Sequence, residues 1–297
     1  MPGQRRRSVH RPSVDRPPLG QHFLRDRSVL AREIAYAELQ GHETVLEIGP
    51  GPGTLTEPLL GAAGRVIAIE KDPRFRQSLE GLGRRFPHLE LIWGDALEVA
   101  LPRFDKVVAN LPFGAALPLT FRLLEQRFDR AVLIYQHRLA ERICAGPGEP
   151  GYCRLGIAIG RRAEAELLEV VRPEAFAPPP AVDSAIVLLR RTRPRFSVPD
   201  EELFRLVLEG LFAYRNEPLG RALTGLTAVG LSRAVLDQTA TRLPRRQLET
   251  PVFRIGPRDF GAICRLLWEL GARADRGALT PSRHRRGPTR NQRAAEA

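Results

Sequence analysis

The chain has 297 residues, of which 43% are hydrophobic and 27% charged, and its formal net charge is +12. This length suits one full α/β domain with a smaller second one, and the absence of a long apolar run or a signal-peptide pattern predicts a cytoplasmic protein without membrane contact. Three scattered cysteines without a C-x-x-C pair (Cys144, Cys153 and Cys264) predict neither a disulfide framework nor a metal site.

The positive charge is concentrated at the two ends. Residues 1–27 and 273–297 each hold seven Arg and two acidic residues, which together contribute +10 and leave +2 for the 245 residues between them. Base composition of the genome explains an excess of Arg over Lys, but it does not explain why the charge lies at the two ends. A polyanionic partner such as RNA explains this location. We therefore predict basic arms at 1–20 and 273–297 that are disordered until they bind RNA.

An amphipathic helix is predicted from about residue 28 to 40, and a buried strand follows at 45–48. A Gly/Pro-rich loop comes next, and Thr54 is a candidate N-cap for the following helix. This order is the first half of a nucleotide-binding βαβ unit. The glycines stand at 49, 51 and 53, whereas a dinucleotide fingerprint needs the third one at position 54. We therefore expect the backbone of this loop to contact an uncharged edge of a nucleoside. We do not expect it to bind a pyrophosphate group.

Carboxylates end the next two predicted strands. Glu70 follows the strand at 65–69, about 20 residues after the glycine loop, where it can accept hydrogen bonds from ribose hydroxyls. Asp95 follows the strand at 89–93, where it can receive an adenine amino group. Either residue alone is more often a solvated strand end. Three strands in order, each followed by a suitable group, predict a site for S-adenosylmethionine (SAM).

The strand at 105–109 is followed by Asn110, Leu111, Pro112 and Phe113. The Asn110 side-chain oxygen and the Leu111 carbonyl can both accept hydrogen bonds from an exocyclic amine. Pro112 stiffens the turn, and Phe113 offers a ring on which an unstacked base can lie. We therefore predict that these four residues bind and activate the amino group of a nucleobase.

Further strands are predicted at 131–135, 165–171 and 185–189, which completes an α/β fold with a doubly wound, mainly parallel sheet. A Pro-bounded hinge is predicted at 194–199. Helices are predicted at 201–212, 219–226, 232–239 and 259–270, which together form a small C-terminal helical domain.

Six ordered motifs resemble the ribosomal RNA adenine N6-dimethyltransferases of the KsgA type, with their archaeal and Erm relatives. They are residues 19–24, 46–56, 69–72, 94–97, 110–113 and 176–185. The resemblance implies a seven-stranded Rossmann-like SAM-dependent methyltransferase domain at 21–193, with the last strand antiparallel, and a helical RNA-binding domain at 200–272. It also implies that the reaction needs no metal ion.

The resemblance further implies site residues, carried over position by position. It places SAM against His22, Leu24, Gly49, Gly51, Glu70, Lys71, Asp95, Ala96 and Asn110. It makes Asn110, Leu111, Pro112 and Phe113 the catalytic segment, and Phe113 and Phe176 the walls around the target base. His22 stands where many members have Asn, and Phe113 stands where KsgA-type members mostly have Tyr. The segment 212–219 is less basic than in relatives, so weaker phosphate contacts are expected there.

The function implied is SAM-dependent N6-methylation, with dimethylation expected, of adenines in small-subunit ribosomal RNA during ribosome biogenesis. The substrate is expected to be a precursor particle and the protein a monomer. One alternative is an Erm-type enzyme that modifies large-subunit RNA and gives macrolide resistance. Another is a nucleic-acid-binding assembly or transcription factor that has lost catalysis. A DNA adenine methylase is the third, but no target-recognition insertion is evident.

Overall fold

The computed structural model describes residues 21–274, so the predicted arm at 1–20 and nearly all of the predicted tail at 273–297 lie outside the described residues. The chain divides into two compact units. The first extends to Ser197 and includes Gly256–Arg258, and the second comprises Val198–Ile255 and the chain from Asp259 onward.

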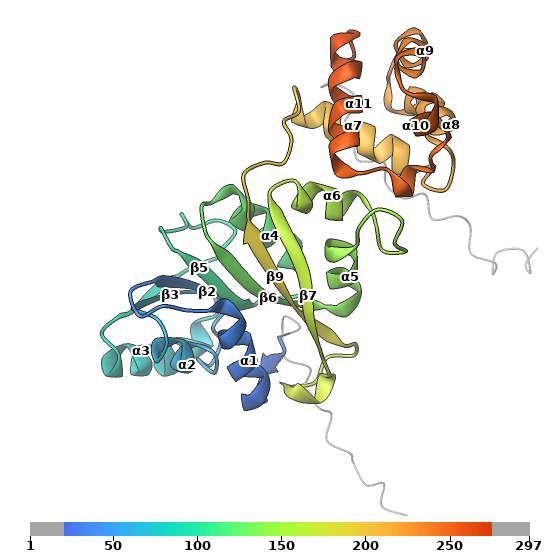
Figure 1. Cartoon of the computed structure of the whole chain (residues 1–297). Helices are drawn as coiled ribbons and strands as arrows, with labels where there is room; N and C mark the ends of the chain where they lie inside the picture. The colour runs from blue at the N-terminus through green and yellow to red at the C-terminus, as the bar shows by residue number, and fades with distance from the viewer. Residues whose placement is uncertain (1–20, 275–297) are drawn as a thin grey trace, which may run out of the picture. The chain divides into compact units, whose positions relative to one another are not determined.

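The first unit is built on a seven-stranded sheet (Figure 1). Its strands, in spatial order, are β4 (Leu89–Trp93), β3 (Arg65–Glu70), β2 (Thr44–Ile48), β5 (Lys106–Asn110), β6 (Arg130–Gln136), β9 (Ser184–Arg191) and β7 (Ala163–Val171). The pairs from β4 to β6 are parallel, and β9 is antiparallel to both of its neighbours. The predicted seven-stranded, doubly wound sheet with an antiparallel last strand is confirmed.

Apolar residues on both faces of the central strands explain why helices cover the sheet on both sides. Val45 and Val66 pack with α1 (Arg27–Ala37) and α2 (Thr56–Leu60). Their strand neighbours point to the opposite face, where they pack with α4 (Ala116–Glu125), α5 (His137–Cys144) and α6 (Arg154–Gly160). The α3 helix (Arg76–Arg85) precedes β4 and follows the short η1 turn (Pro73–Phe75). The sheet is therefore buried on both faces, and its strand ends are free to carry a site.

Two helix starts differ in how they are capped. The Asp26 side chain accepts hydrogen bonds from the main-chain N–H groups of Ser28 and Val29, and so starts α1. The predicted cap at Thr54 is wrong, because α2 begins two residues later and Leu55 at its N-cap makes no side-chain bond. The Gly/Pro loop therefore continues slightly further than the sequence indicated.

A two-stranded ribbon lies beside the main sheet. It pairs β1 (Phe23–Leu24) antiparallel with β8 (Phe176–Ala177), which follows the η2 turn (Pro173–Ala175). The main-chain N–H groups of Arg25 and Asp26 both donate to the carbonyl of Ala175, at 2.8 and 3.2 Å. The segment that enters the domain is thus fixed to a loop about 150 residues later in the chain.

The second unit is helical. It contains α7 (Glu201–Phe212), α8 (Leu219–Thr224), η3 (Gly225–Val229), α9 (Arg233–Arg242), α10 (Arg245–Glu249), η4 (Val252–Arg254) and α11 (Pro257–Glu269). Its core is apolar and includes Leu203, Val207, Leu223, Leu236, Phe260 and Leu267. The predicted C-terminal helical domain is confirmed. Across residues 21–274, no helix combines the length and the apolar character that crossing a membrane requires.

Candidate functional site

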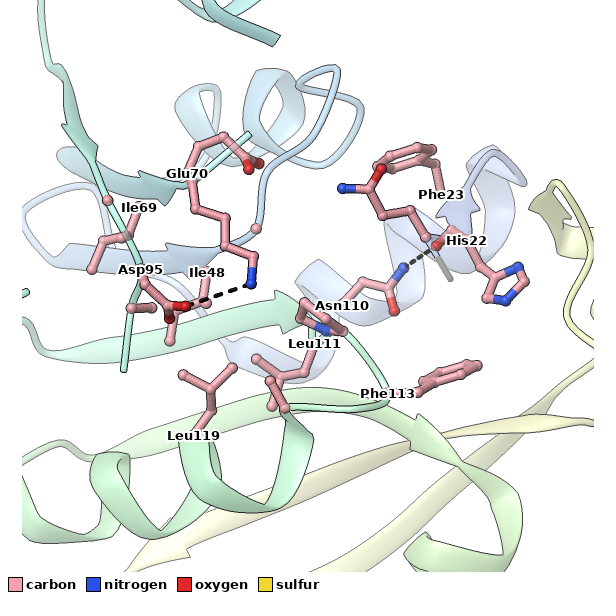
Figure 2. Close-up of a pocket in the computed structure, with 17 residues that line it drawn as sticks. His22, Phe23, Ile48, Ile69, Glu70, Asp95, Asn110, Leu111, Phe113 and Leu119 are labelled. Carbon is pink, nitrogen blue, oxygen red and sulfur yellow. Dashed lines mark hydrogen bonds and ion pairs between the residues drawn. The ribbon is translucent and has the colours of Figure 1, made fainter. Parts of the chain in front are cut away.

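A cavity opens at the carboxyl ends of the parallel strands, around the point where the sheet order reverses between β2 and β5. This is where open α/β sheets bind ligands. Figure 2 shows its lining, which is Gln21, His22, Phe23, Ile48, Gly49, Ile69, Glu70, Lys71, Gly94, Asp95, Ala96, Asn110, Leu111, Pro112, Phe113, Ala115 and Leu119. The ends of β2, β3 and β5 and the loop after β4 thus all contribute residues to one cavity.

Glu70 organises the glycine loop from the end of β3. Its side chain is 5% exposed, and its Oε2 accepts a hydrogen bond from the main-chain N–H of Gly51 at 2.9 Å. The other oxygen, Oε1, accepts from the N–H of Asp72 at 2.7 Å. A carboxylate has about four acceptor positions, so each oxygen can accept one more hydrogen bond from a ligand hydroxyl.

The glycine loop needs glycine for two reasons. Gly49, Gly51 and Gly53 all have positive φ values of 71°, 57° and 92°, which L-residues with a side chain rarely adopt. A Cβ atom at position 51 would also lie only 2.3 Å from the ring of Phe23. The loop therefore passes directly under the N-terminal segment, and its backbone forms one wall of the cavity.

Asp95 lies at the end of the cavity lined by Ile48, Ile69 and Leu119 (Figure 2). Its Oδ1 accepts from the N–H of Leu97 at 2.9 Å, and its Oδ2 lies 3.5 Å from the Nζ of Lys71. These contacts, led by the Leu97 hydrogen bond, hold the pKa of Asp95 below its usual range. An ionised acceptor beside flat apolar walls suits the amino edge of an adenine ring.

Asn110 lies at the opposite end of the cavity, with His22 and Phe113 (Figure 2). Its Nδ2 donates to the main-chain oxygen of His22 at 2.9 Å. The His22 ring is itself held, because its Nδ1 lies 2.8 Å from the carbonyl oxygen of Pro178 and must donate to it. The amide orientation is thereby fixed, and the acceptor Oδ1 of Asn110 is the atom left for a ligand.

Phe113 and His22 form an aromatic wall at this end. Their ring centroids are 5.5 Å apart and their planes are tilted by 32°. Both residues are half-buried, so their faces are supported and still accessible. Such a wall can take an unstacked base.

The structure brings together ten of the residues predicted for the site. His22, Gly49, Glu70, Lys71, Asp95, Ala96, Asn110, Leu111, Pro112 and Phe113 all line the cavity. Gly51 does not line it and contributes through its bond to Glu70. Five further lining residues lie within the motifs at 19–24, 46–56, 69–72 and 94–97, although they were not predicted as site residues: Gln21, Phe23, Ile48, Ile69 and Gly94. Ala115 and Leu119 were not predicted.

Leu24 and Phe176 are placed in the core and not on the cavity wall. They face each other across the β1–β8 ribbon and are only 4% and 3% exposed. Both belong to the apolar cluster that includes Leu30, Val108 and Ile186. The prediction that Phe176 is a wall for the target base is therefore not supported, because the ring is used to anchor the ribbon to the sheet.

The lining fits SAM in the chemistry of its groups. Glu70 offers acceptors for ribose hydroxyls, Asp95 offers one for an amino group, and Ile69, Ala96 and Leu119 offer apolar surface for a purine. The glycine loop brings bare backbone to the same cavity. Among the described residues there is no group of three or more His, Cys, Asp or Glu that could hold a metal ion.

The sheet has a cavity where its strand order reverses, and carboxylates at the ends of its strands line that cavity. These features define the class of Rossmann-like SAM-dependent methyltransferases. Within that class, the sequence model described as "Ribosomal RNA adenine dimethylase" matches residues 13–245, and the chain belongs to that family. The protein is accordingly a SAM-dependent rRNA adenine methyltransferase.

Individual relatives agree with this assignment. Two proteins named "Probable ribosomal RNA small subunit methyltransferase A" are similar over most of the chain. The one from Thermococcus kodakarensis is 42% identical, over 81% of this chain and 86% of its own length. The one from Methanococcus maripaludis strain C7 is 38% identical, over 84% of this chain and 97% of its own length.

Two crystal structures are similar over 84% of the chain. A dimethyladenosine transferase from Plasmodium falciparum has a TM-score of 0.70, is 27% identical and is covered over 97% of its length. The 23S rRNA methyltransferase ErmE has a TM-score of 0.62, is 28% identical and is covered over 99% of its length. A dimethyladenosine transferase and a 23S rRNA methyltransferase therefore both share this fold.

Proposed function

We propose that the protein dimethylates the N6 amino groups of adenines in small-subunit ribosomal RNA, with SAM bound along the cavity from Asp95 to Asn110. The observation that carries the proposal is the orientation of the Asn110 amide. Its Nδ2 is committed to the carbonyl of His22, so its Oδ1 is available to a substrate amine at the end of the cavity. An amide held in this way is suited to an amine donor and not to a carboxylate or a phosphate.

Activation of the amine follows from two acceptors on one segment. The N6 lone pair of adenine is delocalised into the ring, so the amine is a poor nucleophile. Hydrogen bonds from its two N–H groups to Asn110 Oδ1 and to the Leu111 carbonyl favour a tetrahedral nitrogen with its lone pair out of the ring plane. This is positioning together with electrostatic preorganisation.

The rigidity of the segment serves the same purpose. Leu111 is 1% exposed, and the carbonyl of Pro112 accepts from the N–H of Ala115 at 2.9 Å at the start of α4. The two acceptors are thus fixed between β5 and α4. Phe113 stacks on the target base, which must leave its RNA stack to enter the cavity.

The chemical step needs no further catalytic group from the protein. When bound, SAM supplies an electrophilic methyl group on a sulfonium centre. The N–CH₃ bond forms as the S–CH₃ bond breaks, and the nitrogen then carries the positive charge. Its proton leaves to solvent, because a positively charged N6 is strongly acidic. A second transfer at the same nitrogen gives the dimethylated base.

The roles of the remaining residues complete the proposal. Glu70 receives the ribose hydroxyls and Asp95 the amino group of the cofactor adenine, while Lys71, Gly49 and Ala96 line the same space. The small-subunit target is supported by the names and 38–42% identity of the two relatives described above. We further propose that the protein acts as a cytoplasmic monomer on a precursor particle during ribosome biogenesis. Its basic composition supports the RNA partner.

The test is to incubate the purified protein with SAM and with unmodified small or large ribosomal subunits, and then to map methylated adenines in both RNAs. N6-dimethyladenine only in small-subunit RNA is the expected result. Modification only of large-subunit RNA would replace the proposal with an Erm-type activity. If neither RNA is modified although SAM binds, the non-catalytic alternative would be favoured.

A further inference from the structure

A second cavity lies on the other side of the glycine loop. Gly49 borders the proposed SAM cavity, whereas Pro52, Gly53 and Thr54 border the second one. The other walls of the second cavity come from the start of α1, from α2 and from α3. The glycine loop therefore separates the proposed SAM cavity from the second cavity, which offers a separate binding surface.

Two arginines line this surface and have no ion-pair partner among the described residues. Arg25 and Arg27 both line the second cavity and are exposed. Within residues 21–274 neither guanidinium takes part in a hydrogen bond or an ion pair. Asp26 lies between them, and its Oδ1 accepts the hydrogen bonds that cap α1. Glu57, on the same wall, pairs with Arg85 at 2.8 Å. Within the described residues, neither Asp26 nor Glu57 forms an ion pair with Arg25 or Arg27.

Neither side chain makes a hydrogen bond or an ion pair that holds the described part of the fold together. Arg27 is the first residue of α1, where a positive charge is unfavourable because the helix dipole is positive at that end. Arg25 contributes to the fold through its main-chain N–H, which donates to the carbonyl of Ala175, and not through its side chain. The backbone is therefore fixed while both guanidiniums remain available to a ligand.

Their position relates them to the target base. Arg25 lies three residues after His22, which lines the proposed SAM cavity beside Phe113. Three residues of extended chain span at most about 11 Å. A polyanion that delivers a base to Phe113 therefore passes close to Arg25, and guanidinium groups suit bidentate contacts with phosphate.

We propose that Arg25 and Arg27 bind phosphodiester groups of the substrate RNA that flank the target adenine. The inference rests on the proposed function, since it takes RNA as the substrate. The two arginines contribute to RNA affinity and to the register of the strand, and they do not touch the reacting atoms.

The test compares the full-length wild type with the double variant Arg25→Gln/Arg27→Gln. A matched control is Arg103→Gln/Arg127→Gln, which removes the same charge from loops before β5 and β6, at the opposite edge of the sheet. For each protein we would measure the KM and kcat for unmodified small subunits, the Kd for SAM, and the salt dependence of RNA binding without turnover. Thermal unfolding checks that each variant is folded.

The expected result is a roughly ten-fold rise in KM for Arg25→Gln/Arg27→Gln, with unchanged kcat and SAM affinity. The slope of log K against log salt should become shallower by about 1.4–1.8, because each lost phosphate contact removes about 0.7–0.9. The control variant should match the wild type in KM. Arg25→Lys/Arg27→Lys should retain the salt slope, since lysine keeps the charge.

Two outcomes would overturn the inference. One is that Arg25→Gln/Arg27→Gln and the control have the same KM and salt slope. The other is that SAM affinity falls in step with RNA affinity, which would mean that the arginines act through the glycine loop. A wild type that methylates neither ribosomal subunit would instead contradict the proposed function, and the RNA-binding comparison would still test the arginines.

Discussion

The side-chain amide of Asn110 is held by the main chain of His22, with Nδ2 donating to the carbonyl oxygen at 2.9 Å. The two residues are 88 positions apart in sequence. His22 is fixed in turn by its hydrogen bond to the carbonyl of Pro178. The N-terminal segment therefore determines that Oδ1 of Asn110, and not Nδ2, faces the cavity. The proposed chemistry depends on this orientation, and the first prediction follows from it.

Asn110→Ala should lower the rate of methyl transfer by at least about 100-fold and leave SAM affinity largely unchanged. The loss is expected because a preorganised hydrogen-bonding group at a reacting centre contributes about 10²–10³ in kcat. Single-turnover methylation of small-subunit RNA and calorimetric titration with SAM measure the two effects separately. Near-normal turnover in this variant would refute the role of the amide.

Glu70→Ala should weaken SAM binding by roughly 1.5–3 kcal/mol, which is the usual contribution of a hydrogen bond to a charged group. The substitution also removes the acceptor of the Gly51 N–H, so the glycine loop loses its support from β3. Calorimetry gives the Kd directly. The control is Glu90→Ala, because Glu90 is a half-buried residue of β4 that pairs with Arg65 outside the cavity. Equal SAM affinity in the two variants would remove Glu70 from the site.

Phe113→Tyr should retain activity, whereas Phe113→Ala should lose about 1–3 kcal/mol of transition-state stabilisation in kcat/KM for RNA. Both aromatic rings stack on a base and a methyl group does not. The wall that Phe113 shares with His22 gives the ring a fixed position in either case. Steady-state kinetics with saturating SAM make the comparison. Similar kcat/KM values for Ala and Phe would show that the base is held by other groups.

The sheet and the strand-end residues could be predicted because their signals are local. Each parallel strand is a short apolar run, and the group that follows it has to lie at the carboxyl edge. Glu70, Asp95 and Asn110 were placed at the cavity by this reasoning alone. The prediction of the helices at 201–212 and 259–270 rested likewise on the spacing of apolar residues.

The parts that were missed depend on contacts between distant segments. A two-residue strand such as β1 has no periodicity, so its pairing with β8 could not be inferred. That pairing is what places Phe176 in the core. Lys106 is another example, since a lysine is usually exposed. It is only 4% exposed here, and its Nζ donates to the carbonyl of Glu38 at 2.6 Å and lies 2.9 Å from a carboxylate oxygen of Glu43.

Glu33 on α1 and Glu47 on β2 are two buried carboxyl groups that the sequence did not reveal as unusual. They are 0% and 2% exposed, and they border a small cavity behind the glycine loop. Neither oxygen of Glu33 has a hydrogen-bond partner, nor does Oε2 of Glu47. Burial raises the pKa of each group to about 8, and the charge of Glu47 adds to the effect on Glu33.

The sign of the effect on stability follows from these pKa values. Between about pH 4.5 and pH 8 the folded protein keeps protons on both carboxyl groups, whereas the unfolded chain releases them. The unfolding free energy therefore falls as pH rises through this window, by about 1.4 kcal/mol per pH unit for each group. Below about pH 4.5 both states are protonated, and above about pH 8 both are ionised, so the contribution of each group is constant outside the window.

Glu33→Gln should therefore reduce this pH dependence by about half, because only Glu47 still titrates. At pH 7 the buried Glu33 lowers the unfolding free energy of the wild type by about 3 kcal/mol. The variant should regain this amount, less the cost of burying an amide. Urea unfolding between pH 5.5 and pH 8 measures the slope, and the control is Glu125→Gln at an exposed position at the end of α4. The Glu125→Gln control keeps both buried carboxyl groups, so the difference in slope between it and Glu33→Gln reports the removal of Glu33. Identical slopes in wild type and Glu33→Gln would mean that Glu33 is already ionised in the folded protein, with a cation or an ordered water network compensating its charge.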